Sequence, residues 1–298
     1  LSSPPYGIYV HFPWCTSRCP YCDFAVTTEL PVPGARYAAA VIAEIRMRAP
    51  SFAGLRCATL YLGGGTPSLW EARHVARVSA EARALGLPPG AEVTLEANPE
   101  SADARRADAW REAGVTRVSI GVQSFDAAVL RKLGRRHAPA DAERAVREVA
   151  RAIPDVSVDL VYGARRSSAA TARGDAERAA SLPVTHVSAY ALTLDAAVLA
   201  EDVPFARLSR EGKLAFPGDE EVHAQGEAVR EALERGGLRR YEVSNFAVPG
   251  RESRHNLIYW RAESYLGAGA GAVGCRHAGA GARRWSNARD VGAWLEAA

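Results

Sequence analysis

Three of the five cysteines in this chain fall within eight residues, and their spacing could bind a metal. The segment reads Cys15-Thr-Ser-Arg-Cys19-Pro-Tyr-Cys22 and follows a short apolar run. A C-x3-C-x2-C spacing does not put three thiols on one face of a helix. Pro13 and Pro20 instead favour an irregular loop that can wrap around a single group. We therefore predict a metal centre in this loop.

Two kinds of metal centre fit these thiols. A structural zinc site needs four nitrogen or sulfur ligands, so its fourth would come from Cys57, Cys275 or a histidine such as His11. An iron-sulfur cluster can be held by three thiolates while its fourth iron stays open. The cluster is favoured by the lack of a second cysteine pair and by the aromatic residues nearby, Phe12, Trp14, Tyr21 and Phe24.

Six apolar runs suited to buried strands alternate with amphipathic segments of helical length. The runs cover residues 7–11, 58–62, 92–97, 117–120, 156–161 and 186–192. Such alternation predicts βαβ units and a parallel sheet. Six strands with crossover helices predict an α/β fold, an open (β/α)6 partial barrel, whose reactive groups gather at the carboxyl ends of the strands.

Cap and breaker residues indicate where the helices begin and end. We expect helices at 36–48, 141–151, 170–182 and 221–235. The Ser68-Leu-Trp-Glu71 pattern resembles a capping box and predicts a helix from Ser68 to about Leu85. Ser101 is expected to cap the next helix, and Gly114 to end it.

Glycines and polar residues stand where the predicted strands end. Gly63-Gly-Gly-Thr66-Pro67 follows the second strand, Glu96 ends the third and Gln123 follows the fourth. Glu96 and Asp159 are carboxylates within apolar strands, where an unpaired charge is costly. Each is therefore expected to have a cationic or hydrogen-bonding partner.

The cysteine spacing and its flanks, Y-V-H-F-P-W and C-P-Y-C-D-F, resemble the radical S-adenosylmethionine (SAM) superfamily, in its coproporphyrinogen-oxidase-like branch. The resemblance implies a 4Fe-4S cluster on Cys15, Cys19 and Cys22, with SAM on the open iron as the source of a radical. It implies that the cluster-bound SAM is held by Tyr9, Gly64, Gly65, Thr66 and Glu96. It further implies a second SAM surrounded by Tyr21, Gln123, Arg135 and Asp159. After Tyr162 the chain lacks the proline and glutamine usual in that branch.

The carboxy-terminal third, at 241–246, 253–260 and 265–272, is similar to the heme chaperone group of this branch. That similarity implies a protein of porphyrin metabolism that binds heme, passes it to an acceptor protein of unknown identity and receives electrons from a donor. We expect His255 to contact the heme iron, because imidazole is a common axial ligand. The expected organisation is a barrel over 1–200 and an α/β extension over 201–298 packed on it, without the further helical domain of the group.

Two enzymes of the same branch remain alternatives, an oxygen-independent coproporphyrinogen III oxidase and a radical methylase or cyclopropanase. Oxidases of the branch carry a fourth cysteine two places after the third, where this chain has Phe24. Whether the protein is an enzyme therefore stays open, but oxidase activity is not expected.

Composition limits the partners and the compartment. The net charge of +3 is too mild to indicate nucleic-acid binding. No apolar run approaches the roughly 18 residues that span a bilayer. The start of the chain lacks the features of a signal peptide, and the clustered thiols suit a reducing compartment, so we expect a cytoplasmic protein.

Overall fold

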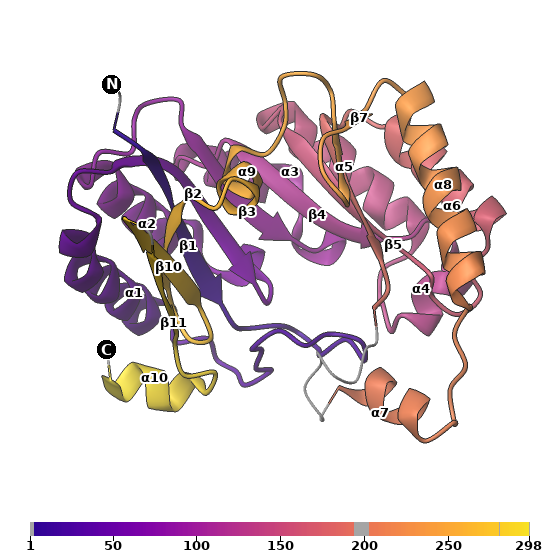
Figure 1. The fold of residues 1–298 in the computed structure, drawn as a ribbon, viewed down its shortest axis with the longest axis horizontal. Coiled ribbons are helices and arrows are strands. Elements are labelled where there is room, and N and C mark those ends of the chain that lie inside the picture. The colour runs from indigo at the N-terminus through magenta and orange to yellow at the C-terminus, as the bar shows by residue number, and fades with distance from the viewer. Residues whose placement is uncertain (1–2, 194–202, 280, 298) are drawn as a thin grey trace.

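A single sheet of eleven strands organises the computed structural model, which describes residues 3–193, 203–279 and 281–297 (Figure 1). Its central strands are parallel and neighbour one another in chain order. They are β1 (Pro5–Phe12), β2 (Arg56–Gly64), β3 (Glu92–Ala97), β4 (Arg117–Gln123), β5 (Val156–Tyr162) and β6 (His186–Ala191). Because β1 and β6 each pair with a different outer strand, the sheet curves without closing. The predicted open six-stranded barrel is confirmed.

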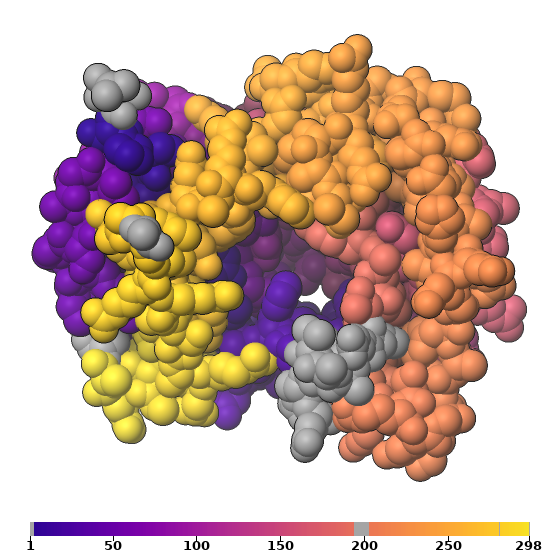
Figure 2. Space-filling view, viewed as in Figure 1, coloured from indigo at the N-terminus to yellow at the C-terminus, as the bar shows by residue number. Residues whose placement is uncertain are grey.

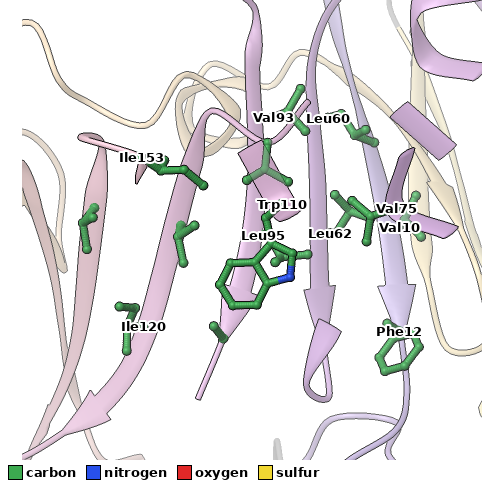
Figure 3. Close-up of a cluster of buried hydrophobic side chains, with 14 of the residues drawn as sticks. Val10, Phe12, Leu60, Leu62, Val75, Val93, Leu95, Trp110, Ile120 and Ile153 are labelled. Carbon is green, nitrogen blue, oxygen red and sulfur yellow. The ribbon is translucent and has the colours of Figure 1, made fainter. Parts of the chain in front are cut away.

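Helices cover the convex face of the sheet and bury its apolar side chains (Figure 1). Between the strands lie α1 (Gly34–Arg48), α2 (Ala72–Ala84), α3 (Ala104–Glu112), α4 (Ala127–Lys132), α5 (Pro139–Ala152) and α6 (Ala169–Ala180). Leu62 and Leu95 are fully buried, and Trp110 of α3 lies in the same cluster (Figure 3). Truncating such a leucine to alanine costs about 2–5 kcal/mol, so this layer fixes the strands whose ends carry the polar residues.

Residues after 202 extend the sheet at both edges. The segment contains α7 (Pro204–Arg210), α8 (Asp219–Arg235), β7 (Arg239–Arg240), β8 (Asn245–Ala247), α9 (Arg254–Trp260), β9 (Ser264–Ala268), β10 (Val273–Ala278), β11 (Gly281–Ser286) and α10 (Val291–Ala297). Strand β8 pairs antiparallel with β6, and β9 pairs parallel with β1. The predicted boundary between residues 200 and 201 lies outside the described residues. None of the described helices is long and apolar enough to cross a membrane.

Two of the predicted helix starts are wrong. Ser68 lies in a 3-10 turn, Pro67–Leu69, and α2 begins four residues later because its N-cap is Glu71. Ser101 likewise ends a 3-10 turn, and Asp103 caps α3 by accepting a hydrogen bond from the backbone N–H of Arg106. Both serines are buried and bond to each other through their hydroxyls, so neither can face a helix end.

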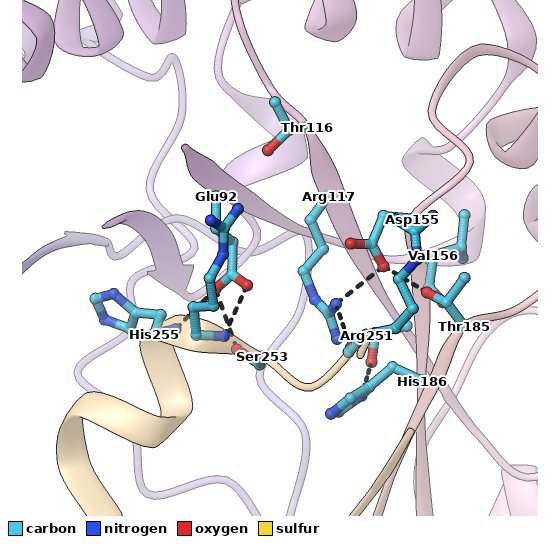
Figure 4. Close-up of polar contacts among 12 residues, drawn as sticks. Glu92, Thr116, Arg117, Asp155, Val156, Thr185, His186, Arg251, Ser253 and His255 are labelled. Atoms are coloured by element: carbon cyan, nitrogen blue, oxygen red, sulfur yellow. Dashed lines mark hydrogen bonds and ion pairs between the residues drawn. The ribbon is translucent and has the colours of Figure 1, made fainter. Parts of the chain in front are cut away.

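Charged groups close the amino-terminal end of the barrel (Figure 4). Glu92, at the start of β3, accepts hydrogen bonds from the backbone N–H groups of Arg254 and His255, in the first turn of α9. A carboxylate there satisfies donors that have no partner within the helix. Nearby, the buried guanidinium of Arg117 donates to Asp155 at 2.9 Å. The bonds to Glu92 hold α9 against the barrel.

Candidate functional site

A cavity of about 540 Å³ opens at the carboxyl ends of the parallel strands. Figure 2 shows the hollow between the yellow carboxy-terminal segment and the orange segment. The cavity is lined by every residue predicted for the cluster and for SAM except Tyr9: Cys15, Cys19, Cys22, Tyr21, Gly64, Gly65, Thr66, Glu96, Gln123, Arg135 and Asp159. Residues from five strand ends thus meet in one place, as expected for an open barrel.

The cysteine loop presents its thiols beside hydrogen-bond donors. The hydroxyl of Thr66 donates to the Cys15 sulfur at 3.5 Å, and the Arg135 guanidinium donates to the Cys19 sulfur at 3.6 Å. Donors and a cation at these distances suit thiolate ligands, whose negative charge they stabilise. Burial raises the pKa of the Cys15 thiol to about 11, so iron would displace a proton from it.

Three thiolates in one loop match an iron-sulfur cluster, which uses a separate iron for each of them. Among the residues that the structure describes, no three His, Cys, Asp or Glu side chains are grouped closely enough to hold one metal ion.

The turn after β2 requires glycine at positions 64 and 65, because the end of β1 and the cysteine loop pack directly against it. A Cβ on Gly65 would lie 2.8 Å from the carbonyl carbon of Pro13, and a Cβ on Gly64 would lie 2.5 Å from the ring of His11. Gly64 also has φ +111°, a conformation that disfavours other residues. The backbone N–H of Thr66 donates to the carbonyl of Trp14 at 2.8 Å. The turn and the cysteine loop therefore form one unit.

Glu96 and Asp159, the two carboxylates within strands, have the hydrogen-bonding partners that we predicted from the sequence. Glu96 accepts from the Tyr61 hydroxyl at 2.7 Å and from the Gly64 N–H at 2.9 Å, and Asp159 accepts from Ser119 at 3.0 Å. Burial nevertheless raises the pKa of Glu96 to about 7 and that of Asp159 to about 6. Within the described part of the chain no cationic side chain bonds to either carboxylate, so a ligand's positive charge would be stabilised here, above all beside Glu96.

Asn98 and Tyr61 are site residues that the sequence did not single out. Asn98 donates to Thr66 at 3.0 Å and accepts from Arg135 at 2.6 Å, which links the glycine turn to the cation beside Cys19. Asn98 follows Glu96 by two positions at the same strand end, and this spacing could have indicated it. Tyr61 gave no such signal.

A backbone irregularity places Gln123 in the cavity wall. It has φ +69°, and the register with β5 shifts between Ile120 and Gln123. Such shifts re-aim side chains near functional sites.

Tyr9 lies outside the main cavity. It lines a separate hollow of about 260 Å³, and its hydroxyl bonds the ring of His11 at 2.9 Å. Its ring centroid lies 6.1 Å from that of Tyr61, which donates to Glu96, so Tyr9 is close to the predicted SAM-binding residues without lining their cavity.

His255 does not have the setting predicted for a heme ligand. It is 1% exposed, its Nδ1 bonds the Thr59 hydroxyl at 2.7 Å and its Nε2 bonds the Tyr259 hydroxyl at 2.9 Å. Burial lowers its pKa to about 3, so the ring is neutral. Because both nitrogens are engaged inside the barrel, His255 has no ligand position to offer, and we correct this expectation.

The fold and the cavity are those of a radical SAM protein. The Radical SAM superfamily matches residues 9–169, which include the second half of β1, all of β2 to β5 and all the residues predicted for the cluster and SAM. A solved structure of the radical SAM enzyme HemN, the coproporphyrinogen III oxidase of Escherichia coli, superposes with a TM-score of 0.78 over 99% of this chain and 69% of that one. At 20% identity this likeness supports the fold alone.

Curated relatives narrow the class. The heme chaperone HemW of Mycobacterium tuberculosis is 38% identical over 99% of this chain and 75% of its own length. HemW of Escherichia coli is 36% identical over 91% of this chain and 70% of its own length. The chain therefore belongs to the HemW family of radical SAM proteins. Its cofactors include a 4Fe-4S cluster and SAM.

Proposed function

We propose that this protein is a heme chaperone, which binds heme and transfers it to an acceptor protein while carrying a 4Fe-4S cluster and a SAM site. The similarity to proteins named heme chaperone HemW, which extends over nearly the whole chain, carries this proposal. Phe24 adds to it, since this side chain occupies the place at which oxidases of the branch have a further cysteine.

The cavity residues divide into two groups in this proposal. Cys15, Cys19 and Cys22 hold the cluster. SAM lies against the glycine turn, Thr66 and Glu96, where backbone amides and a carboxylate meet its amino-acid portion. Tyr21, Gln123, Arg135 and Asp159 line the rest of the cavity and would surround a second SAM.

The partners follow from these cofactors. A cluster that cleaves SAM needs an electron donor, and a chaperone needs an acceptor, whose identity we leave unspecified. We place the protein in the cytoplasm, because the clustered thiols would be kept reduced there.

The test is heme titration into the anaerobically reconstituted protein, followed by mixing with apomyoglobin as the acceptor. We expect saturable binding and the appearance of the holomyoglobin spectrum at a rate that differs from that of free heme. A Cys15→Ser variant, compared with and without SAM, shows whether transfer depends on the cluster. Failure of the wild-type protein to retain any heme would refute the proposal.

A further inference from the structure

The seven histidines differ sharply in how accessible their rings are. Five are buried, namely His11, His74, His137, His186 and His255, and none is more than 5% exposed. His223 is exposed on α8, and His277 is half-buried on β10. Because an axial ligand must present a nitrogen to the iron, the choice falls between His223 and His277.

His277 belongs to a group of side chains on one face of the outer strands. Cys275 stands two positions before it, so the two side chains point to the same side of β10. The Sγ of Cys275 lies 3.4 Å from the Nε2 of His277. Cys275 is also directly opposite Tyr265 of β9 and Arg284 of β11. Four different functional groups, an imidazole, a thiol, a phenol and a guanidinium, therefore share this face.

This face continues into the 260 Å³ hollow beside the main cavity. Val273, two positions before Cys275, lines the hollow together with Tyr265, Tyr259 and Phe24. The Tyr259 and Tyr265 rings meet edge to face with centroids 4.8 Å apart. Tyr259 is 40% exposed and Phe24 is 59% exposed. Exposed flat rings on a concave wall suit a planar apolar ligand.

Phe24 connects this hollow with the cluster site, because it lines both cavities. Arg289 also lines the hollow, and its guanidinium donates to the backbone carbonyl of Asp23, the residue after Cys22. A ligand on the face of β10 would therefore lie beside the cysteine loop. In the sheet, β10 and β11 form the outer edge beyond β9, which pairs with β1 (Figure 1).

We propose that heme binds on this face, with the imidazole of His277 as axial ligand, the rings of Tyr259, Tyr265 and Phe24 along the porphyrin and Arg284 at a propionate. The inference rests on the proposed function and names its binding site. To reach iron, His277 gives up a weak contact to sulfur, whereas His255 would lose two bonds to hydroxyl groups. In the free protein, the Cys275 sulfur holds the ring in place. The exposed guanidinium of Arg284 can form a charge-assisted hydrogen bond with a carboxylate.

The experiment is hemin titration into the cluster-loaded protein, followed by visible spectroscopy, for four variants and the wild type. We expect His277→Ala to shift the Soret band and to weaken binding at least about tenfold, the loss typical when a metal site is disrupted. Cys275→Ser, which keeps a polar contact to the ring, has a smaller effect. Arg284→Glu weakens binding without moving the Soret band, because it changes a propionate contact and leaves the axial ligand in place. His223→Ala is the matched control, an accessible histidine elsewhere, and behaves like the wild type.

Iron and sulfide content and SAM binding, measured on each variant, show that the fold is intact. If His277→Ala lost its cluster, the test would rest on Arg284→Glu, whose substitution is on an exposed residue. Weaker heme binding in that variant would support the site, and wild-type affinity would overturn it. Wild-type spectrum and affinity in His277→Ala, or a loss in His223→Ala instead, would overturn this site and leave the chaperone function standing. Absence of heme binding in the wild type would refute both the proposed site and the chaperone function.

Discussion

The backbone N–H of Gly65 donates to the carbonyl oxygen of Phe12 across 2.7 Å, and this bond ties the turn after β2 to the segment that enters the cysteine loop. A side chain at Gly65 would meet the backbone of that segment, which cannot move aside as a flexible side chain could. The geometry of the SAM-binding turn and that of the cluster loop are thus set together.

Gly65→Ala should therefore damage both halves of the site. We expect a loss of stability of about 1–3 kcal/mol, the usual cost of overpacking, together with a lower iron content. Urea unfolding and iron analysis measure the two effects. Gly174→Ala is the control, since Gly174 lies in α6 with open space around it and should gain up to about 1 kcal/mol. Equal behaviour of the two variants would contradict the close packing at Gly65.

Replacing any one of Cys15, Cys19 and Cys22 by serine should abolish the cluster, because each thiolate binds its own iron. The measurements are iron and sulfide content and the visible spectrum after anaerobic reconstitution. Cys57→Ala is the matched control, for Cys57 is buried in β2 beside Tyr6, away from the cavity. An unchanged iron content in any of the three serine variants would remove that cysteine from the site.

SAM affinity should fall as the pH is lowered through about 7. The pKa of Glu96 is raised to about 7 by burial, so below that pH the free protein holds a neutral carboxyl that cannot pair with an ammonium group. The weakening approaches about tenfold per pH unit. Glu96→Gln should bind SAM at least about tenfold more weakly at pH 8 and lose the pH dependence, whereas the exposed-surface variant Glu71→Gln should keep both. Calorimetric titration of each protein with SAM at several pH values measures this dependence.

The same raised pKa predicts how stability varies with pH in the absence of SAM. Between pH 4.5 and 7 the folded protein holds a proton on Glu96 that the unfolded chain releases, so stability declines as the pH rises through this window. Glu96→Gln should flatten the decline by about 1–3 kcal/mol. Denaturant titrations at about pH 5 and about pH 8 compare the wild type with Glu96→Gln. A Glu96→Gln variant whose stability falls as steeply as that of the wild type across the window would contradict the raised pKa of Glu96.

Coproporphyrinogen III should not be decarboxylated by this protein. Phe24 stands at the rim of the main cavity, where oxidases of the branch place a cysteine. Anaerobic incubation with SAM, a reductant and the substrate is expected to yield no protoporphyrinogen by chromatography. Product formed over many turnovers would move the protein to the oxidases.

The fold was predictable to the extent that local pattern decides it. Strand β3 has the predicted bounds, because a buried parallel strand is a continuous apolar run between turn residues. Ser68 was misassigned because its Ser-x-x-Glu pattern also fits a 3-10 turn that begins at Pro67. Local sequence does not distinguish the two structures.

For the site as well, local motifs could be predicted from the sequence, whereas contacts between distant residues could not. The cysteines and glycines could be proposed from the sequence because each motif lies within a few consecutive residues. Tyr61 was missed because its role depends on the register that sets it beside Thr94 and so within reach of Glu96. His255 was misplaced because its partner Thr59 stands 196 residues earlier. Such distant pairings are properties of the folded chain.

The parallel pairing of β1 with β9 has a consequence for synthesis. Tyr6 is opposite Ser264, so one edge of the first strand has no partner until β9 has left the ribosome, well after β2 to β6. An unpaired strand edge is a template for aggregation while it waits. The nascent protein therefore passes through its longest period of vulnerability with β1 to β6 already made, and a holding chaperone acting on this edge during translation should raise the yield of folded protein.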